Sequence, residues 1–180
     1  NVAANGVTVL SMNWVTTPRQ IMSVKPLNRY EDLANLLVRV PASTYATFFS
    51  AAGASPVTMT FNDVYSGLDS GIVEAVEAPL GTLYSYSLYE VAKYVALSNH
   101  CLAPALLCMN TDIFESLSEK QQKALVDGSV YAGDLYTKAC ADSMADYRTK
   151  MEAEGVTFID WTGEDIQKMT QAAMEVYAAY

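Results

Sequence analysis

A long segment without proline, residues 118–155, constrains the fold more than any other part of this sequence. Only Gly128 and Gly133 interrupt it, and apolar residues recur along it at roughly helical spacing. Ser118 and Gln121 have the spacing of a capping box, which marks the start of a helix. At 1.5 Å per residue, one helix of this length spans about 50 Å or more. A compact domain of this size is not that wide, so we expect the helix to cross between two lobes or to run along one face of the molecule.

Ahead of this helix, short apolar segments alternate with helical ones. The predicted strands are 7–10, 37–40, 56–59, 72–75 and 102–109, and the predicted helices are 30–37, 43–52, 62–71 and 80–97. This alternation is typical of α/β proteins with mostly parallel sheets, in which the apolar segment 102–109 should be a buried strand. After the long helix we expect a strand at 156–159 and a last helix that Thr162 caps, with Asp165 at its third position.

Composition excludes several classes of protein. Hydrophobic residues make up 51% of the chain and charged residues 17%, so the chain is not disordered as a whole. The formal charge is −9, with 11 Lys and Arg against 20 Asp and Glu, which argues against general nucleic-acid binding and against a polybasic membrane surface. No apolar run reaches the ~18 residues that a membrane-spanning helix needs.

The three cysteines, Cys101, Cys108 and Cys140, contain no CxxC pair. An odd number of cysteines without that pair predicts neither a disulfide framework nor a zinc site. We expect them to be small buried apolar side chains, and a single disulfide stays open if the compartment is oxidising.

Residue types for catalysis are scarce. The chain has one histidine, His100, and no nucleophile elbow, zinc-protease motif, phosphate-binding loop or dinucleotide-binding motif. The sequence therefore predicts no cofactor and no metal. An α/β enzyme that acts on a carboxylate, with Glu77 or His100 as acid or base, remains the alternative, although a lone histidine is more often structural.

Arg39 stands out because it lies inside an apolar strand end, Leu37–Pro41. A charge in such a place needs a partner, because burying it unpaired is costly. The pattern alone leaves two interpretations open, a structural ion pair or a ligand carboxylate held by the planar guanidinium. Trp14, near the end of a predicted strand, is a further candidate for a pocket wall, although such aromatic residues more often belong to a core.

Several segments together resemble one family. They are Leu37–Pro41 (LVRVP), Gly53–Tyr65 (GASPVTMTFNDVY), Gly71–Glu74 (GIVE), Glu77–Leu80 (EAPL), Tyr89–Tyr94 (YEVAKY), Ser98–His100 (SNH) and Phe114–Lys123 (FESLSEKQQK). In this order and spacing the sequence resembles the solute-binding proteins of TRAP transporters, the dicarboxylate-binding type. The resemblance implies a two-lobed α/β fold like that of periplasmic binding proteins, with a long helix that spans both lobes. It also implies capture of a small organic acid in the periplasm, or by a lipid-anchored extracytoplasmic protein, without catalysis and for delivery to the TRAP membrane subunits.

The resemblance also implies roles for individual residues. Arg39 matches the family's arginine that forms the carboxylate salt bridge, and Arg19 matches a second arginine that assists it. Phe61 matches a phenylalanine that lines the pocket. Glu77 and Ala78 match the family's "Q-E-N-P" segment, in which alanine here replaces the asparagine that commonly contacts the ligand. Val76 likewise replaces the glutamine of that segment. Because two polar groups are missing there, we expect a less polar or bulkier acid than usual.

The family comparison also predicts how the chain is divided. Residues 1–180 would be a portion of a longer solute-binding protein, with about 17–101 and 143–180 in the second lobe. Residues 102–142, with part of the long helix, would be the remainder of an incomplete first lobe and would leave an exposed apolar sheet edge at 102–109. A shortened chain, a proteolytic remnant and compensation by self-association stay open as explanations. Another open alternative is a fragment that binds no solute and instead contacts a partner through the tyrosine-rich face at 80–94.

Overall fold

The computed structural model describes residues 5–178, which divide into two compact units. Unit 1 is Asn1–Thr17 with Leu102–Met144, and unit 2 is Pro18–Cys101 with Ala145–Tyr180. The predicted long helix is confirmed as α5, Glu119–Ala153, whose first part belongs to unit 1 and whose last part belongs to unit 2. No helix within residues 5–178 combines the length and the apolar character that crossing a membrane requires.

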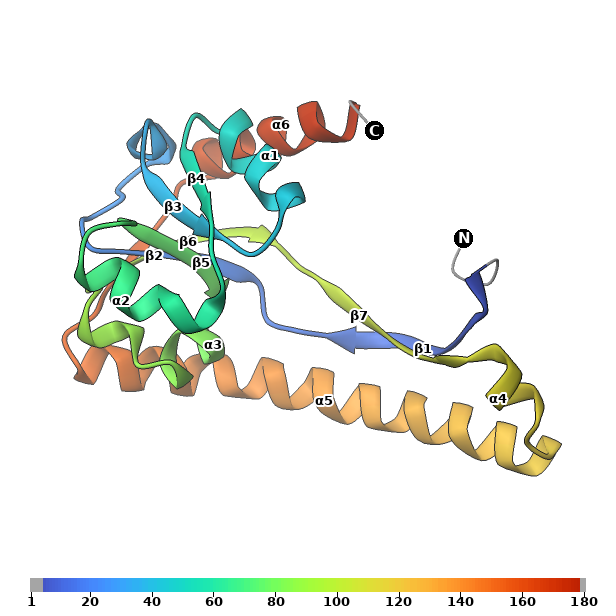
Figure 1. Cartoon of the computed structure of the whole chain (residues 1–180). Helices are drawn as coiled ribbons and strands as arrows, with labels where there is room; N and C mark the ends of the chain where they lie inside the picture. The colour runs from blue at the N-terminus through green and yellow to red at the C-terminus, as the bar shows by residue number, and fades with distance from the viewer. Residues whose placement is uncertain (1–4, 179–180) are drawn as a thin grey trace. The chain divides into compact units, whose positions relative to one another are not determined.

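Unit 2 is built on a six-stranded sheet with the order β4-β3-β5-β2-β6-β8 (Figure 1). Its strands are β2 (Arg19–Ser23), β3 (Leu37–Val40), β4 (Ser55–Thr58), β5 (Ala75–Pro79), β6 (Tyr94–Cys101) and β8 (Thr157–Asp160). Strand β2 runs antiparallel to both of its neighbours, β5 and β6, whereas every other pairing is parallel. The sheet is therefore mixed, and the expectation of mostly parallel strands fails at β2, which the sequence pattern did not reveal.

Helices cover both faces of this sheet. Helices α1 (Ser43–Ala51) and α6 (Gly163–Ala178) lie side by side on one face, and α2 (Val64–Asp69) and α3 (Leu80–Ser85) lie on the other (Figure 1). Short 3-10 turns occur at η2 (Tyr30–Leu33), η3 (Phe61–Asp63) and η4 (Leu88–Glu90). The core beneath α1 and α6 contains fully buried side chains from the sheet, the turns and the helices, including Ile21, Leu33, Leu36, Val38, Val40, Phe49, Ala75 and Ala96.

The predicted helix at 80–97 is wrong. Helix α3 ends at Ser85, the η4 turn follows, and β6 begins at Tyr94. Ser87 adopts a left-handed conformation with φ of 53°, which ends the helical path. Val95 and Ala96 are fully buried on β6, which lies between β2 and β8 in the sheet. A strand buried on both faces lacks the polar alternation that would distinguish it from a buried helix.

Unit 1 contains a two-stranded antiparallel ribbon of β1 (Val7–Val15) and β7 (Pro104–Asn110), with α4 (Thr111–Glu115) and the first part of α5. The prediction of a buried strand at 102–109 is wrong, because β7 is mostly exposed. Within the described residues β7 has only β1 as a neighbour in its sheet. The expectation of buried cysteines is also wrong, because Cys108 is exposed on β7 and Cys101 and Cys140 are only half-buried; all three thiols are free.

Gly133 explains how β1 and α5 pack within unit 1. The side chain of Asn13 donates hydrogen bonds to the carbonyl of Val130 and to a carboxylate oxygen of Asp134, both at 2.7 Å. A Cβ atom at position 133 would lie 2.3 Å from Oδ1 of Asn13. Glycine in the middle of this helix costs helical stability, but it leaves room for the asparagine to reach the helix backbone.

The predicted capping box at the start of α6 is confirmed. The backbone N–H of Thr162 donates to Oδ2 of Asp165 at 2.9 Å, and the N–H of Asp165 donates to the hydroxyl of Thr162 at 3.3 Å. Oδ1 of Asp165 accepts a further bond at 2.9 Å from the N–H of Tyr30. The same carboxylate therefore caps α6 and ties it to the η2 turn.

This cap predicts a pH-dependent contribution to stability. The hydroxyl of Thr162 and the N–H of Tyr30 lower the pKa of Asp165. Because the pKa is lower in the folded chain than in the unfolded chain, the contribution is complete above the unfolded pKa and is lost as the pH falls through the folded pKa. We expect Asp165→Asn to cost about 1 kcal/mol at pH 7 and less toward pH 3, measured by urea unfolding against the parent chain. Asp160→Asn, which alters an exposed carboxylate, is the control, and a cost for Asp165→Asn that does not change with pH would contradict this account.

Candidate functional site

Arg39 lies near the end of β3 and is 3% exposed, although it carries a permanent charge. Its Nε atom donates a hydrogen bond of 2.9 Å to the carbonyl of Met59. Its guanidinium carbon lies 4.8 Å from the centre of the Phe61 ring, in the range of a cation–π contact. The structure therefore brings together Arg39 and Phe61, two residues that the sequence singled out.

One donor of Arg39 is left without a partner. Within residues 5–178, its Nη1 atom is buried and has no hydrogen-bond acceptor. Burial lowers the pKa of Arg39, and the Glu77 carboxylate offsets this only in part, but a guanidinium stays protonated at neutral pH. A buried, charged donor without an acceptor is costly, so the Nη1 atom has an unmet capacity to donate a hydrogen bond.

The ring of Phe61 contacts a second aromatic side chain. The centres of the Phe61 and Tyr86 rings are 4.4 Å apart, and the two planes are tilted by 59°. Tyr86 caps the end of α3 and is 46% exposed. Arg39, Phe61 and Tyr86 thus form a continuous row, which we call the Arg39 row, from a buried charge to a half-exposed ring.

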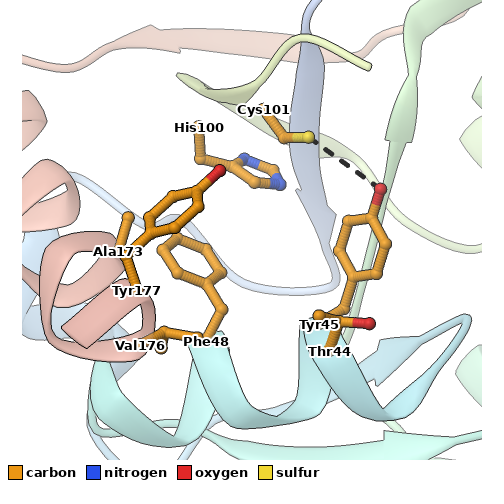
Figure 2. A pocket seen from close by; sticks show the side chains of 8 residues that line it. All are labelled: Thr44, Tyr45, Phe48, His100, Cys101, Ala173, Val176 and Tyr177. Carbon is orange, nitrogen blue, oxygen red and sulfur yellow. Dashed lines mark hydrogen bonds between the residues drawn. The ribbon is translucent and has the colours of Figure 1, made fainter. Parts of the chain in front are cut away.

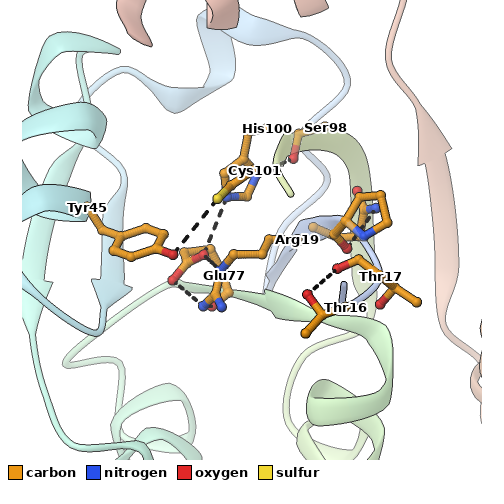
Figure 3. A network of polar contacts seen from close by, with 10 residues as sticks. Thr16, Thr17, Arg19, Tyr45, Glu77, Ser98, His100 and Cys101 are labelled. Atoms are coloured by element: carbon orange, nitrogen blue, oxygen red, sulfur yellow. Dashed lines mark hydrogen bonds and ion pairs between the residues drawn. The ribbon is translucent and has the colours of Figure 1, made fainter. Parts of the chain in front are cut away.

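Arg19 is engaged by Glu77 rather than left open (Figure 3). The carboxylate of Glu77 accepts from Nε of Arg19 and, at 2.7 Å, from Nη2, which also donates at 3.0 Å to the Glu77 carbonyl. The Glu77 side chain is 0% exposed. Burial lowers the pKa of Arg19, but the ion pair with Glu77 outweighs that effect and raises it. The two oppositely charged groups therefore neutralise each other at the junction of β2 and β5.

His100 extends this pair into a buried network. Nε2 of His100 lies 3.4 Å from a carboxylate oxygen of Glu77, and Nδ1 lies 2.7 Å from the hydroxyl of Ser98. Because a carboxylate can only accept, Nε2 carries the proton and Nδ1 accepts from the serine. Burial lowers the pKa of His100, with Glu77 opposing it, so the imidazole is neutral at pH 7. Glu77 and His100 are both enclosed and hydrogen-bonded, which suits a structural role better than acid–base work on a substrate.

Ala78 and Gln20 pair across β5 and β2. Val76 on β5 is the register partner of Arg39 on β3, so their side chains point to the same face of the sheet. Ala78 lies two residues after Val76 and therefore points to that face as well. It is almost fully buried. An alanine at this position adds no hydrogen-bonding group to that face.

Trp14 lies on β1 in unit 1. Its indole Nε1 donates to the hydroxyl of Ser11 at 2.8 Å, and its ring centre lies 5.5 Å from that of Tyr136. The indole is thus partnered inside unit 1 by one hydrogen bond and one ring contact.

A largely apolar cavity of 470 Å³ opens elsewhere in unit 2, between α1, the end of β6 and α6 (Figure 2). It is lined by Thr44, Tyr45, Phe48, His100, Cys101, Ala173, Val176 and Tyr177. Tyr45 connects it to the buried network, because its ring centre lies 5.1 Å from the Arg19 guanidinium and its hydroxyl lies 3.9 Å from the Cys101 thiol. None of the six residues predicted to bind ligand lines this cavity.

Sequence reasoning missed two features of the site. It named Glu77 and His100 without the buried contact between them, and it did not connect Tyr86 with Phe61. The segment Ser98–His100 was part of the family resemblance, which was the available signal for the network. The tyrosine-rich segment 80–94 gave no sign that Tyr86 contacts Phe61, because that contact depends on where α3 ends. Among the described residues, no three His, Cys, Asp or Glu side chains come together to hold a metal ion.

Comparison with known proteins identifies the family. The family model of the bacterial extracellular solute-binding proteins, family 7, matches residues 1–180. The chain is 30% identical over 161 residues to the 2,3-diketo-L-gulonate-binding periplasmic protein of Escherichia coli, covering 88% of this chain and 49% of that protein. It is 27% identical over 168 residues to the sialic acid-binding periplasmic protein of Vibrio cholerae, covering 93% of this chain and 51% of that protein. A crystal structure of a TRAP periplasmic solute-binding protein from Roseobacter denitrificans with bound L-galactonate matches with a TM-score of 0.83 and 27% identity, covering 97% of this chain and 57% of that one.

These matches confirm the resemblance and the binding-protein fold class that the sequence predicts. The relatives are solute-binding proteins rather than enzymes, and the family is extracytoplasmic, as expected. The chain spans about half the length of the curated relatives it matches. The chain belongs to family 7 of the bacterial extracellular solute-binding proteins.

Proposed function

We propose that unit 2 holds the carboxylate of a small organic acid on Arg39. The acid would be captured outside the cytoplasmic membrane and delivered to the membrane subunits of a TRAP transporter. The observation that carries this proposal is the buried Nη1 donor of Arg39, which has no acceptor within the described residues. A ligand carboxylate would supply that acceptor through a charge-assisted hydrogen bond.

The surroundings of Arg39 support binding of an anion. The Met59 carbonyl fixes Nε, and the Phe61 ring covers one face of the guanidinium, so the group is held in place before a ligand arrives. A preorganised donor loses little conformational entropy on binding. Glu77, the carboxylate that acts on Arg39, is already neutralised by Arg19 and does not occupy the open donor.

The relatives indicate the class of acid. The proteins from Escherichia coli, Vibrio cholerae and Roseobacter denitrificans are named for, or bind, 2,3-diketo-L-gulonate, sialic acid and L-galactonate, which all carry a carboxylate. We therefore propose that this chain serves a carboxylic acid, released unchanged after binding. Residues 17–101 and 143–180 would be the second lobe of the binding protein, and 102–142 would be part of its first lobe.

The test is ligand binding by the parent chain and by Arg39→Ala. A thermal melt against monocarboxylates, dicarboxylates, sugar acids and aromatic acids identifies a ligand, because one at about a hundred times its Kd adds about 2.7 kcal/mol of stability. Isothermal titration with that ligand should then show about hundredfold weaker binding to Arg39→Ala, since a lost hydrogen bond to a charged group costs up to about 3 kcal/mol. Arg39→Lys should recover only part of the loss, because an ammonium group cannot reproduce the planar fork.

The matched control is Arg29→Ala, which removes an exposed arginine that pairs with Asp32 on the η2 turn. It should leave the Kd unchanged. Equal affinity of the parent chain and Arg39→Ala for the same acid would show that Arg39 is not the carboxylate site. Chemical conversion of the bound acid would instead support the enzyme alternative.

A further inference from the structure

The Arg39 row continues beyond the residues needed to hold a carboxylate. The guanidinium carbon of Arg39 lies 4.8 Å from the centre of the Phe61 ring, and the centres of the Phe61 and Tyr86 rings are 4.4 Å apart. Arg39 is almost fully buried, whereas Tyr86 is half-exposed. An acid whose carboxylate reaches Arg39 from solvent would therefore have its remaining atoms beside the two rings.

Tyr86 is held in place by its backbone but has a free end. Its N–H donates to the carbonyl of Thr82 at 3.2 Å, and the N–H of the next residue, Ser87, donates to the carbonyl of Tyr84 at 2.9 Å, which fixes Tyr86 as the cap of α3. Among the described residues, its hydroxyl group has no hydrogen-bond partner. The ring is thus positioned by the fold, and its outer edge and hydroxyl are available to another molecule.

The chemistry of the row disfavours a second charge on the ligand. The face of an aromatic ring carries partial negative charge, so it attracts C–H groups and cations and repels carboxylates. Ala78, on the same face of the sheet as Arg39, adds no amide to bind a second polar group. A ligand with an apolar or ring-shaped distal end fits these surroundings better than a short dicarboxylate does.

We propose that Tyr86 determines ligand selectivity by contacting the end of the acid that is remote from the carboxylate, and that it favours acids with an apolar or ring-shaped end. This inference rests on the proposed role of Arg39, because the carboxylate there sets the direction of the ligand. It assigns Tyr86 a contact with ligand that no residue pattern in the sequence suggested.

The test compares two acids of matched length, 3-phenylpropionate and succinate, which differ in carrying a phenyl group or a carboxylate at the far end. Isothermal titration of the parent chain should show tighter binding of 3-phenylpropionate. Tyr86→Ala should weaken binding of that acid about fivefold and change the Kd for succinate less than about twofold, since one aromatic contact is worth about 1 kcal/mol. Tyr86→Phe keeps the ring and should retain the preference for 3-phenylpropionate.

Tyr131→Ala is the control, because Tyr131 is an equally large but more exposed tyrosine on α5. It should leave both Kd values unchanged, and thermal melts of all variants verify that they are folded. Equal weakening of both acids by Tyr86→Ala, or a parent chain that prefers succinate, would overturn the selectivity role. If Arg39→Ala still abolished binding in that case, the proposed carboxylate site would stand; if it changed neither acid, the proposed function would fall as well.

Discussion

Replacing Glu77 with alanine is expected to lower the free energy of unfolding by about 3 kcal/mol, because it leaves buried charge without its counter-charge. The Glu77 side chain is fully enclosed and holds two donor groups of Arg19 as well as Nε2 of His100. Arg19 is largely buried at the same place, so water can replace the lost carboxylate only in part. Removing one member of a buried ion pair costs more than the pair contributes, since the other member keeps its desolvation penalty.

Urea unfolding of the parent chain, Glu77→Ala and Glu77→Gln measures this effect. Glu77→Gln should lie between the other two, because an amide oxygen still accepts hydrogen bonds but carries no charge. Glu74→Ala is the control, since Glu74 pairs with Lys25 at 2.7 Å near the surface and such pairs contribute about 1 kcal/mol or less. A loss for Glu77→Ala no larger than that for Glu74→Ala would show that the network does not stabilise unit 2.

Phe49→Ala should be the most destabilising single change, with a loss of about 4 kcal/mol. Phe49 is fully buried on α1, in the core beneath α1 and α6, and its ring centre lies 5.4 Å from that of His100 in an edge-to-face contact. Truncation removes a large apolar side chain and leaves a cavity that the surrounding sheet cannot fill. The measurement is the unfolding free energy from urea titration.

Phe48→Ala is the matched control for this change. Phe48 stacks on His100 with ring centres 5.9 Å apart, but it is only partly buried and lines the cavity beside α6. Its loss should therefore be distinctly smaller than that of Phe49→Ala. Equal losses would indicate that contact with the histidine, rather than burial in the core, determines the cost.

Local signals predicted much of the fold. The capping residues Thr162 and Asp165 marked the start of α6, and the absence of proline marked α5. A strand was predicted at 72–75, whereas β5 is Ala75–Pro79. The prediction stopped too early because the centre of β5 carries Glu77, and a charged residue is not expected in a buried strand. Strand β2 was missed since its five residues have no alternating pattern and its place between β5 and β6 is a tertiary property. Periodicity detects an element with one solvent-facing side and fails where both sides are covered.

The identity of the site residues was more accessible than their contacts. Arg39 could be identified from the sequence because a charge in an apolar strand needs a partner. Within the described residues, its Nη1 atom has no such partner. The pairing of Arg19 with Glu77, 58 residues later, depends on the register of β2 against β5, which no local pattern encodes. The same holds for Phe61 and Tyr86, since their contact requires α3 to end where Ser87 turns the chain.

The ribbon of unit 1 has a consequence for synthesis on the ribosome. Thr8 of β1 and Thr111, directly after β7, are joined by a 3.0 Å hydrogen bond although 103 residues separate them. At about 5–20 residues per second, translation leaves β1 without its partner strand for roughly 5–20 s. During that interval the residues of unit 2 up to Cys101 emerge and can form most of their sheet, whereas the apolar strand Val7–Val15 still lacks β7. Among the described strands, β1 is therefore the one whose partner is synthesised after the longest delay.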